Sequence, residues 1–304
     1  MKIEEILKSF ELYEKEYKRE AVDAAIAQQN EITPHLISVL EDVLSDPEKF
    51  ADHSSNYFAH NYAFILLGYF GEEKAHDVIV NIASLSKELP DKLFGDTITN
   101  YLSLALLQTC GGNVAKIKKL ILNKDAYEFS RGAAIEALAY AYIEGYMSRE
   151  EIVSFYRELF TGKMGGAASS FYDILAGSIC DIYPEELMEN IKEAYDEGLL
   201  HSWFVGYDEF VEAMKEGRDK CINRFQEGLK SKQACKVHGA MSWWACFQQP
   251  QRRSPPKTLT DLFEKEQQQV PTKKPKSISK HNTKKKKSKR KQAKASKKAN
   301  RKKR

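Results

Sequence analysis

The stretch FSRGAAIEALAYAYIEG, residues 129–145, decides the fold class. Its apolar side chains recur at the three- and four-residue spacing of a helix face, and they do not alternate as in a strand. The small residues Ala133, Ala134 and Ala137 let a second helix approach closely, and Gly145 is suited to end the helix in a left-handed conformation. The stretch therefore predicts a helix that packs against other helices.

The same period continues through almost every apolar stretch on either side of this segment. Thr33 and Pro34 have the residue types of an N-cap and a first helical position, the Asp46-Pro47 step should end that helix, and Gly71 should end the next. The expected helices cover residues 34–45, 57–70, 78–85, 97–110, 114–121, 129–143, 152–160, 171–182, 185–197 and 207–229.

These helices fall into pairs. The first members begin near Tyr57, Thr97, Phe129 and Ser169, with gaps of about 40, 32 and 40 residues, which suit helical-hairpin repeats. Such a hairpin cannot bury its apolar face alone, so its neighbours must stack on it. Residues 129–145 look most like the first helix of a HEAT repeat. We therefore predict an all-α fold, an irregular HEAT-like α-solenoid, with a non-repeating helical bundle as the alternative.

Charge divides the chain into two parts. Residues 271–304 carry 18 Lys or Arg and no Asp or Glu, whereas residues 1–270 carry 29 basic and 43 acidic side chains. We expect a helical-repeat domain over residues 1–230, a capping segment and linker with Trp and Cys over residues 231–270, and a disordered Lys-rich tail over residues 271–304. The charged region Tyr207–Leu229 is expected to cap the array.

Several classes of protein are disfavoured by composition. The N-terminus has no apolar core of a signal peptide, and no apolar run approaches the roughly 20 residues that cross a bilayer. The five cysteines are scattered and odd in number, which argues against a disulfide framework and for a reducing compartment. We expect a cytoplasmic protein with no membrane segment.

Four stretches together resemble a bacterial family, domain-of-unknown-function family 1186: EITPHLISVLEDVLSDP (31–47), LFGDTIT (93–99), IYPEELMENIKEAYDEGL (182–199) and SWWACF (242–247). The resemblance covers roughly residues 15–250 and implies an α-helical, HEAT-like body with no accepted activity. Many members end in a SEC-C zinc motif built from closely spaced Cys pairs. No cysteine follows Cys246 here, so that metal role does not transfer.

The basic tail predicts binding to a polyanion. Each Lys or Arg that neutralises a phosphate releases counterions, so such a tail binds RNA or DNA with little sequence preference. No aromatic residue follows Phe263, so base stacking is not expected. An acidic protein surface, a nuclear-import signal and a merely solubilising tail are the alternatives. The candidate residues are Lys284, Lys285, Lys286, Lys287, Lys289, Arg290, Lys291, Lys297, Lys298, Arg301, Lys302, Lys303 and Arg304.

Aromatic residues near the end of the body form a second candidate site. Trp243, Trp244 and Phe247 lie close together in a loop-like segment and could anchor a peptide. In the alternative interpretation the segment folds back and caps the last hairpin.

Metal ligands are weakly indicated. Asp52, His53 and His60 would need one shared helix, and we interpret the histidines as packing or surface residues. Cys221, Cys235, His238 and Cys246 have the spacing C-x13-C-x2-H-x7-C, which lacks a second close pair for zinc. We expect no metal and no cofactor.

Catalytic residues are not indicated either. Asp96, Asp125, Asp173 and Asp181 are interpreted as helix caps, and Asp125 as a partner of Arg131 between units. Neither Gly111-Gly112 nor Gly165-Gly166 is followed by the Lys-Ser or Lys-Thr of a phosphate loop.

The sequence therefore predicts a non-enzymatic binding or scaffold protein. Its body would engage a protein or peptide, and its tail would engage nucleic acid, RNA in the first place. One alternative is a host-directed factor whose tail serves nuclear entry. Another is an unrecognised enzyme, which a cleft collecting His60, Asp96 and other polar groups from separate helices would support.

Overall fold

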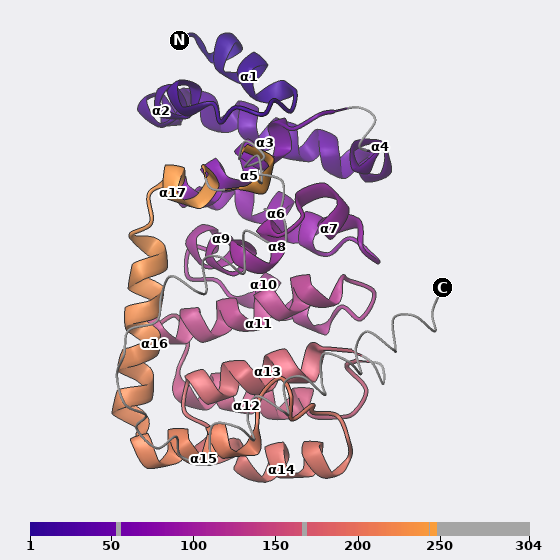
Figure 1. The fold of residues 1–304 in the computed structure, drawn as a ribbon, viewed down its shortest axis with the longest axis vertical. Coiled ribbons are helices and arrows are strands. Elements are labelled where there is room, and N and C mark those ends of the chain that lie inside the picture. Colours follow the sequence, from indigo (N-terminus) through magenta and orange to yellow (C-terminus); the bar gives the residue numbers. More distant parts are fainter. Residues whose placement is uncertain (53–55, 166–168, 243, 248–304) are drawn as a thin grey trace, which may run out of the picture. The chain divides into compact units, whose positions relative to one another are not determined.

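The computed structural model describes residues 1–52, 56–165, 169–242 and 244–247. Every regular element in these ranges is helical, which confirms the all-α class (Figure 1). Extended chain in the described ranges pairs at two isolated bridges, Leu12 with Tyr57 and Ser86 with Ala126. None of the described helices combines the length and the apolar character that crossing a membrane requires.

The helices before the quoted segment are short, apart from one of 17 residues. They are α1 (Ile3–Glu11), α2 (Arg19–Ala27), α3 (Gln29–Ser45), α4 (Pro47–Ala51), α5 (Ala59–Phe70), α6 (His76–Ala83), α7 (Leu89–Phe94), α8 (Thr97–Asn100), α9 (Leu102–Thr109) and α10 (Ala115–Leu122).

The quoted segment forms α11 (Glu128–Ile143), and six α-helices follow it in the described ranges. They are α12 (Arg149–Leu159), α13 (Phe171–Asp181), α14 (Met188–Asp196), α15 (Tyr207–Glu216), α16 (Arg218–Gln233) and α17 (Val237–Met241). Short 3-10 turns occupy Glu73–Ala75, Glu185–Leu187 and Ala245–Phe247.

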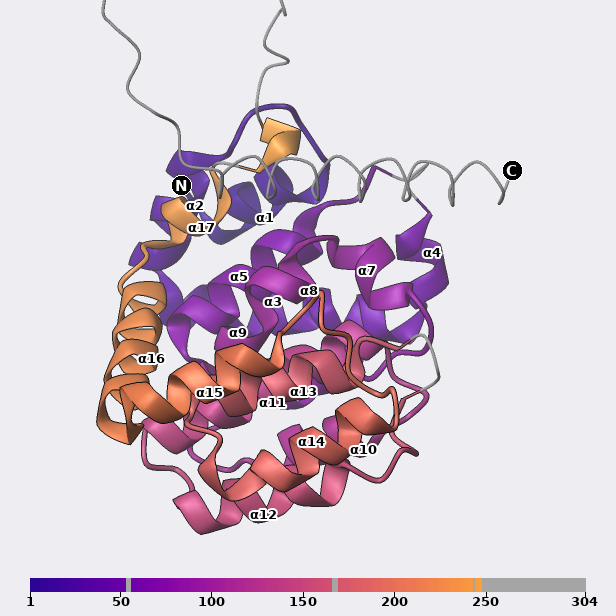
Figure 2. The same cartoon turned by 60° about the horizontal axis from the view of Figure 1, so that its bottom comes forward.

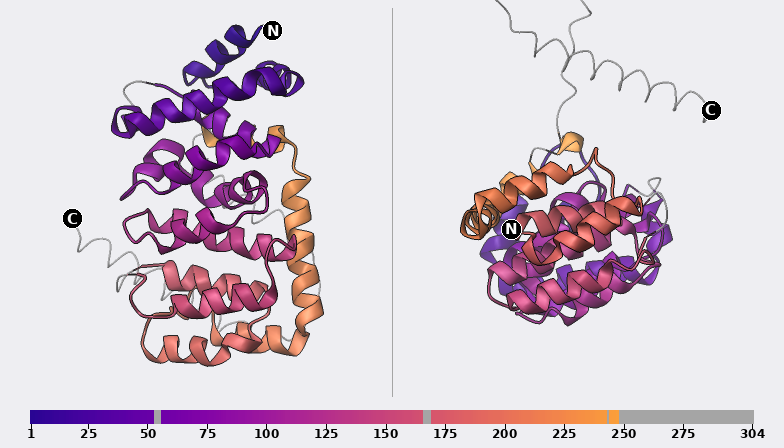
Figure 3. Two further views of the ribbon diagram at one scale, coloured as in Figure 1. Left: turned by 180° about the vertical axis from the view of Figure 1, so that it is seen from behind. Right: turned by 90° about the horizontal axis from the view of Figure 1, so that it is seen from below.

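The predicted first members of the hairpins stack on one another within Met1–Gln249, which is one compact unit of the chain. Helix α5 packs on α9, α9 on α11, and α11 on α13. Helix α6, which follows α5 in the chain, contacts α3 and α9, and α10, which follows α9, contacts α6 and α11 (Figures 1 and 3). The stacking of the first members follows the prediction, while their pairing into hairpins and the assignment to HEAT-like repeats stay predictions.

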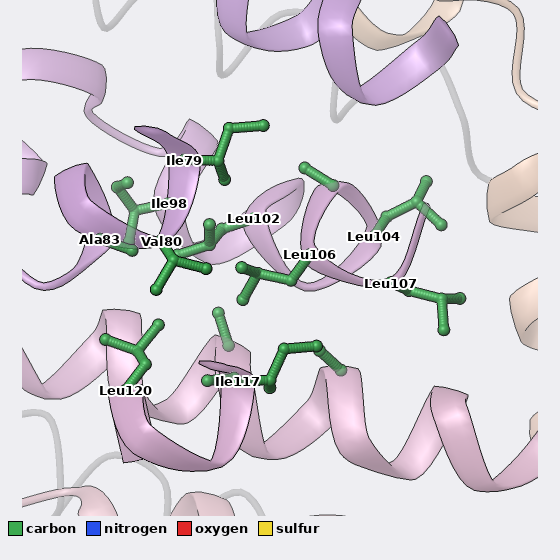
Figure 4. Close-up of a cluster of buried hydrophobic side chains, with 14 of the residues drawn as sticks. Ile79, Val80, Ala83, Ile98, Leu102, Leu104, Leu106, Leu107, Ile117 and Leu120 are labelled. Carbon is green, nitrogen blue, oxygen red and sulfur yellow. The ribbon is translucent and has the colours of Figure 1, made fainter. Parts of the chain in front are cut away.

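Branched apolar side chains fill the space between the layers. Figure 4 shows Ile79 from α6, Leu102 and Leu106 from α9, and Ile117 and Leu120 from α10 gathered into one cluster, all 0–1% exposed. Burying such side chains contributes about 1.5–3 kcal/mol each before conformational entropy is subtracted. The stack therefore holds together through side chains that no single hairpin could bury.

The chain then returns along this stack. Helix α16 runs beside the ends of the stacked helices, from α15 back toward α5 (Figures 1 and 3). It contacts α11 and α13, and α17 contacts α5. We call the described residues of 218–247 the strap.

The start of α3 differs from the sequence prediction. The helix begins at Gln29 rather than at Pro34, which lies inside it. Proline lacks the N–H that would bond the carbonyl of Asn30, so one helical hydrogen bond is lost. The earlier start adds residues 29–33 to the helix, and Ile32 among them is fully buried. The free energy gained by this burial is larger than the cost of the missing hydrogen bond.

The predicted carboxylate caps form no capping hydrogen bonds. Asp96 does lie at the N-cap position of α8, but no described helix start has a side-chain cap from Asp96, Asp125, Asp173 or Asp181. Asp181 ends α13, and Asp173 is buried and binds a loop described below. A carboxylate near a helix start predicts a cap only when the first free N–H groups are within its reach.

The expected ion pair between Asp125 and Arg131 is also wrong. Arg131 is buried, and its Nε and Nη1 donate to the carbonyls of Ile121 and Met164 at 2.9 and 2.7 Å. Its guanidinium lies 4.1 Å from the ring centre of Phe171. Desolvation lowers the pKa of Arg131, and the side chain joins consecutive hairpins through carbonyl oxygens instead of a carboxylate.

The charged region 207–229 was expected to be a helical region that caps the array. The structure divides it at Gly217, whose φ of +90° breaks the chain into α15 and α16. Helix α16 then lies along the stack instead of across its last hairpin (Figure 1). A left-handed glycine reverses direction without strain, which permits this turn.

Candidate functional site

A pocket of about 810 Å³ lies between the helical stack and the strap. The α4–α5 connection and α5 supply one part of its lining, and residues 91–101 around α7 and α8 supply another. The strap supplies the opposite part with six residues. These are Lys232, Cys235, Gly239, Ala240, Trp244 and Cys246.

Aromatic rings dominate the lining. Tyr57, Phe58 and Trp244 are half-buried, and Phe94 is buried beneath them. The rings of Phe58 and Trp244 meet edge to face at 6.4 Å, so the stack and the strap touch at this point. Aromatic faces that are half-exposed in a concave site offer apolar contact area to a ligand at little cost in side-chain entropy.

His60 lies at the base of the pocket and is 3% exposed. Its ring stacks on Tyr57 at 5.7 Å and meets Phe94 edge to face at 5.1 Å. Its Nε2 lies 2.7 Å from the carbonyl oxygen of Leu93, to which it donates, so Nδ1 is left as a buried acceptor without a partner in the described ranges. Burial lowers the pKa of His60 to about 4, so the imidazole is neutral at pH 7.

Charged side chains line the pocket from two sides. Asp91 and Asp96 are exposed and come from the segment around α7. Lys232 comes from the strap, and its Nζ donates to Glu136 on α11 at 2.9 Å. The positive charge of Lys232 and the hydroxyl of Tyr140 hold the pKa of Glu136 below its ordinary value although burial opposes them. Lys232 is thereby partly neutralised, whereas on the other side Asp52, Asp91 and Asp96 outnumber Lys92 and leave that side acidic.

The strap is fastened to the start of the chain. The hydroxyl of Tyr13 donates to the carbonyl of Cys246 at 2.7 Å. His238 bridges Tyr17 and Asp23, with its Nδ1 2.8 Å from the Tyr17 hydroxyl and its Nε2 2.8 Å from Asp23. These contacts join residues more than 200 positions apart in sequence and hold Trp244 at the pocket.

The structure brings two of the predicted aromatic residues together. The rings of Trp244 and Phe247 stack with their centres 6.0 Å apart; Trp244 lines the pocket, and Phe247 packs behind it beside Tyr17 and Phe58 at 5.6 and 5.9 Å. The segment does fold back, but it covers the first helices and not the last hairpin. Trp243 and the basic residues of 284–304 lie outside the described residues, and their binding roles stay predictions.

The structure gives the weak metal candidates other surroundings. Cys221 is buried beside Tyr183 and Ala213, and both ring nitrogens of His238 have the partners named above. Within the described ranges no three His, Cys, Asp or Glu residues come together as ligands. His53 lies outside these ranges.

Sequence reasoning missed most of the pocket lining. Tyr57, Phe58 and Tyr101 fell within expected helices and Phe94 within the LFGDTIT stretch, and nothing in their spacing places them opposite Trp244. One signal was available: LFGDTIT and SWWACF, two of the stretches that carry the family resemblance, meet at this pocket. His60 and Asp96, which were named for the enzyme alternative, line it as well.

Comparison with known proteins supports the resemblance. The family described as "Protein of unknown function (DUF1186)" matches residues 1–248. An uncharacterized protein of Chlamydia trachomatis serovar D is 32% identical over 206 residues, which are 67% of this chain and 81% of that protein. One from Chlamydia muridarum is 32% identical over 206 residues, 67% of this chain and 82% of its own length.

No solved structure matches the chain. The family match nevertheless includes all of the described helices and both parts of the pocket lining. The chain belongs to the DUF1186 family.

Proposed function

We propose that this chain is a non-enzymatic binding protein whose pocket takes a peptide segment of a partner protein. The observation that carries the proposal is the half-exposed aromatic wall between the stack and the strap. The pocket's volume of about 810 Å³ falls within the roughly 300–1,000 Å³ of typical ligand sites. Such sites are mostly apolar with a few polar groups, which is the composition of this lining.

The lining favours a peptide with one large apolar or aromatic side chain. That side chain would enter between Tyr57, Phe58 and Trp244 and complete the burial of their rings. The side-chain amide of Asn100 lies at the same pocket and is exposed. An amide both donates and accepts hydrogen bonds, so it suits the alternating groups of a peptide backbone.

An enzyme acting in the same pocket is the second candidate. The observation that favours it is the gathering of His60 and Asn61 from α5 and Asp96 from the start of α8 at one pocket. Against it, the pKa of His60 near 4 makes the imidazole a weak base at neutral pH, and its Nε2 is already bound to a carbonyl. We therefore favour binding without turnover.

The basic tail adds a second contact in this proposal. Its 18 Lys and Arg residues without a carboxylate suit the phosphates of RNA, and tethering two weak contacts raises the overall affinity through effective concentration. We place the protein in the cytoplasm, since all five cysteines are free thiols, as expected in a reducing compartment.

Peptide display tests the pocket. A random peptide library is selected on the full-length chain, and recovered peptides are measured against variants by titration. We expect selected peptides to carry an aromatic or branched apolar residue and to bind Trp244→Ala at least tenfold more weakly, as hot-spot anchors do. Tyr69→Ala, which removes an exposed ring outside the pocket, is the matched control.

Two outcomes contradict the pocket proposal. One is recovery of no peptide that distinguishes Trp244→Ala from Tyr69→Ala. The other is chemical conversion of the bound peptide by the wild type but not by His60→Gln, detected by mass spectrometry, which would establish the enzyme instead.

Deletion of residues 271–304 tests the tail separately. Retention on single-stranded RNA at low salt should fall steeply, while the helical circular dichroism signal and the melting temperature stay nearly unchanged. Equal retention by the full-length and deleted chains would contradict polyanion binding by the tail and leave the pocket proposal standing.

A further inference from the structure

The loop between α14 and α15 presents two large aromatic side chains to solvent. Trp203 is 74% exposed and Phe204 is 45% exposed. Their ring centres lie 6.0 Å apart, so the two rings form one surface, which we call the Trp203 platform. The loop lies at the end of the stack opposite α1 (Figures 1 and 2), away from the elements that line the pocket.

The loop that carries the platform is fixed by buried contacts. Asp173 on α13 is 2% exposed and accepts from the backbone N–H and from Nδ1 of His201, both at 2.8 Å. Tyr195 on α14 donates its hydroxyl to the carbonyl of Val205. The neighbouring Leu200 is buried beneath the loop. The two exposed rings are therefore held outward by a loop that is tied down on both sides of them.

Exposing an indole to water is unfavourable, because the free energy falls when its apolar surface is removed from water. Tryptophan is also the residue most enriched at the anchor positions of protein interfaces, usually with a polar border. The Trp203 platform has this border, since Ser202 and Asp208 beside it are exposed. A fixed loop that presents two rings has the properties of a docking surface.

Charge identifies the chemistry of the partner. Residues 189–216 carry eight carboxylates and two lysines. Five of the exposed carboxylates flank the loop on the end of α14 and the start of α15. They are Asp196, Glu197, Asp208, Glu209 and Glu212.

We propose that the Trp203 platform docks a basic segment of a partner protein, in which Lys or Arg residues flank an apolar side chain. The apolar side chain would cover the rings, and the cations would face the surrounding carboxylates and the indole. The same carboxylates would repel the phosphates of nucleic acid and of anionic membranes. This site is independent of the pocket and of the proposed function.

Synthetic peptides without tryptophan test the platform. The probe is a 14-residue peptide of lysine and leucine in helical spacing, and its glutamate–leucine counterpart is the control. Binding to the full-length chain is followed by calorimetric titration and by the blue shift of tryptophan emission, and loss of that shift in Trp203→Ala assigns it to Trp203 rather than to Trp243 or Trp244. We expect the lysine–leucine peptide to bind and to bind Trp203→Ala at least tenfold more weakly. The basic tail attracts the glutamate–leucine peptide, so its affinity should be the same for the wild type and Trp203→Ala.

Charge variants separate the platform from the general acidity of the body. Asp208→Asn with Glu212→Gln should weaken the affinity at least threefold. Glu41→Gln with Glu48→Gln removes two exposed carboxylates at the other end of the stack and should leave it unchanged. Because Trp203 is exposed, its replacement should leave the melting temperature unchanged, which keeps the binding result interpretable.

Four outcomes would overturn the platform. They are equal affinity of the wild type and Trp203→Ala for the lysine–leucine peptide, equal weakening of both peptides by Trp203→Ala, equal weakening by both pairs of charge variants, and no binding of the lysine–leucine peptide. Weakening by Trp244→Ala but not by Trp203→Ala would assign the peptide to the pocket and overturn the platform while supporting the proposed function.

Discussion

Helices α11 and α16 are both 16 residues long, and they differ in what stabilises them. Eleven residues of α11 are buried, whereas two residues of α16, Cys221 and Leu229, are buried. Helix α11 lies between α9 and α13, while α16 lies along the edge of the stack (Figure 1). Two helices of the same length can therefore have different roles. One that buries several faces forms the centre of a core, and one that buries a single narrow face lies on the surface of that core.

This difference in burial matters for the pocket, because one wall of the pocket comes from the buried stack and the other from the less buried strap. The wall from α5 to α8 belongs to the stack, whose apolar side chains are shared between layers. The other wall belongs to the strap, which depends on Leu229, on the Lys232–Glu136 contact and on the fastening at His238. Regions with few buried apolar contacts open locally at lower free energy than the core. We therefore expect the strap to open while the stack stays folded.

Equal truncations in the two helices should give the largest contrast. Leu138 in α11 and Leu229 in α16 are 0% and 1% exposed, so Leu→Ala removes the same buried atoms at both. Leu138→Ala should lower the free energy of unfolding of the stack by about 2–5 kcal/mol and leave the free energy of strap opening unchanged. Leu229→Ala should lower the free energy of strap opening, and that of the stack by no more than the wild-type strap-opening free energy. The measurement is the exchange of α11 and α16 amides in urea, and an equal loss in α11 and α16 for Leu138→Ala would mean that strap and stack unfold as one unit.

Acid should act on the stack through His60. The folded-state pKa near 4 is below the ordinary value of 6.5, so protonation favours the unfolded chain. The resulting stability is fully present above pH 6.5 and is lost as the pH falls to about 4. Between pH 7 and pH 4 the wild type should lose about 3 kcal/mol more than His60→Gln.

The exposed His35 provides the control for this pH profile. His35→Gln should follow the wild type when the free energy of unfolding is measured by urea titration at each pH. Parallel profiles of the wild type and His60→Gln would show that His60 is not buried neutral at the base of the pocket.

Replacing Gly68 or Gly228 by alanine should change the stability of the protein in opposite directions. A Cβ at Gly68 on α5 would lie 2.9 Å from the ring of Tyr101 and 3.1 Å from Cβ of Ala105, so Gly68→Ala should cost about 1–3 kcal/mol. A Cβ at Gly228 on α16 would meet nothing within 4 Å, so Gly228→Ala should stabilise α16 by about 0.5–1 kcal/mol. Thermal unfolding of both variants checks the signs, and destabilisation by Gly228→Ala would indicate that α16 is packed more closely than described.

The stack could be predicted because its signals are local. The apolar period of residues 129–145 and the breaks at Gly71 and Gly145 each act within one helix, and the structure contains all of them. Pro34 shows the limit of such local signals. Proline usually starts a helix, but α3 begins five residues earlier because other helices bury Ile32.

The pocket could not be predicted in the same way, because its walls meet over long separations. Tyr13 bonds Cys246 across 233 residues, and His238 bonds Asp23 across 215. The apolar period of a helix does not indicate that the end of the chain packs against its beginning. Trp244 and Phe247, which stack on each other, were named as binding residues, but Phe58, which meets both rings from α5's N-cap, was not. The polar contacts that fasten the strap involve ordinary Tyr, His and Asp residues, whose roles depend on where α16 leads the chain.

Amide hydrogen exchange of the full-length chain in low urea tests the account most directly. The exchange of α16 and α17 is compared with that of α11 in the same sample. The account predicts that strap amides exchange through an opening whose free energy is several kcal/mol below that of α11 and depends weakly on urea. Equal opening free energies with equal urea dependence in α11 and α16 would contradict it, because the pocket would then lie inside one cooperative unit with no separable wall.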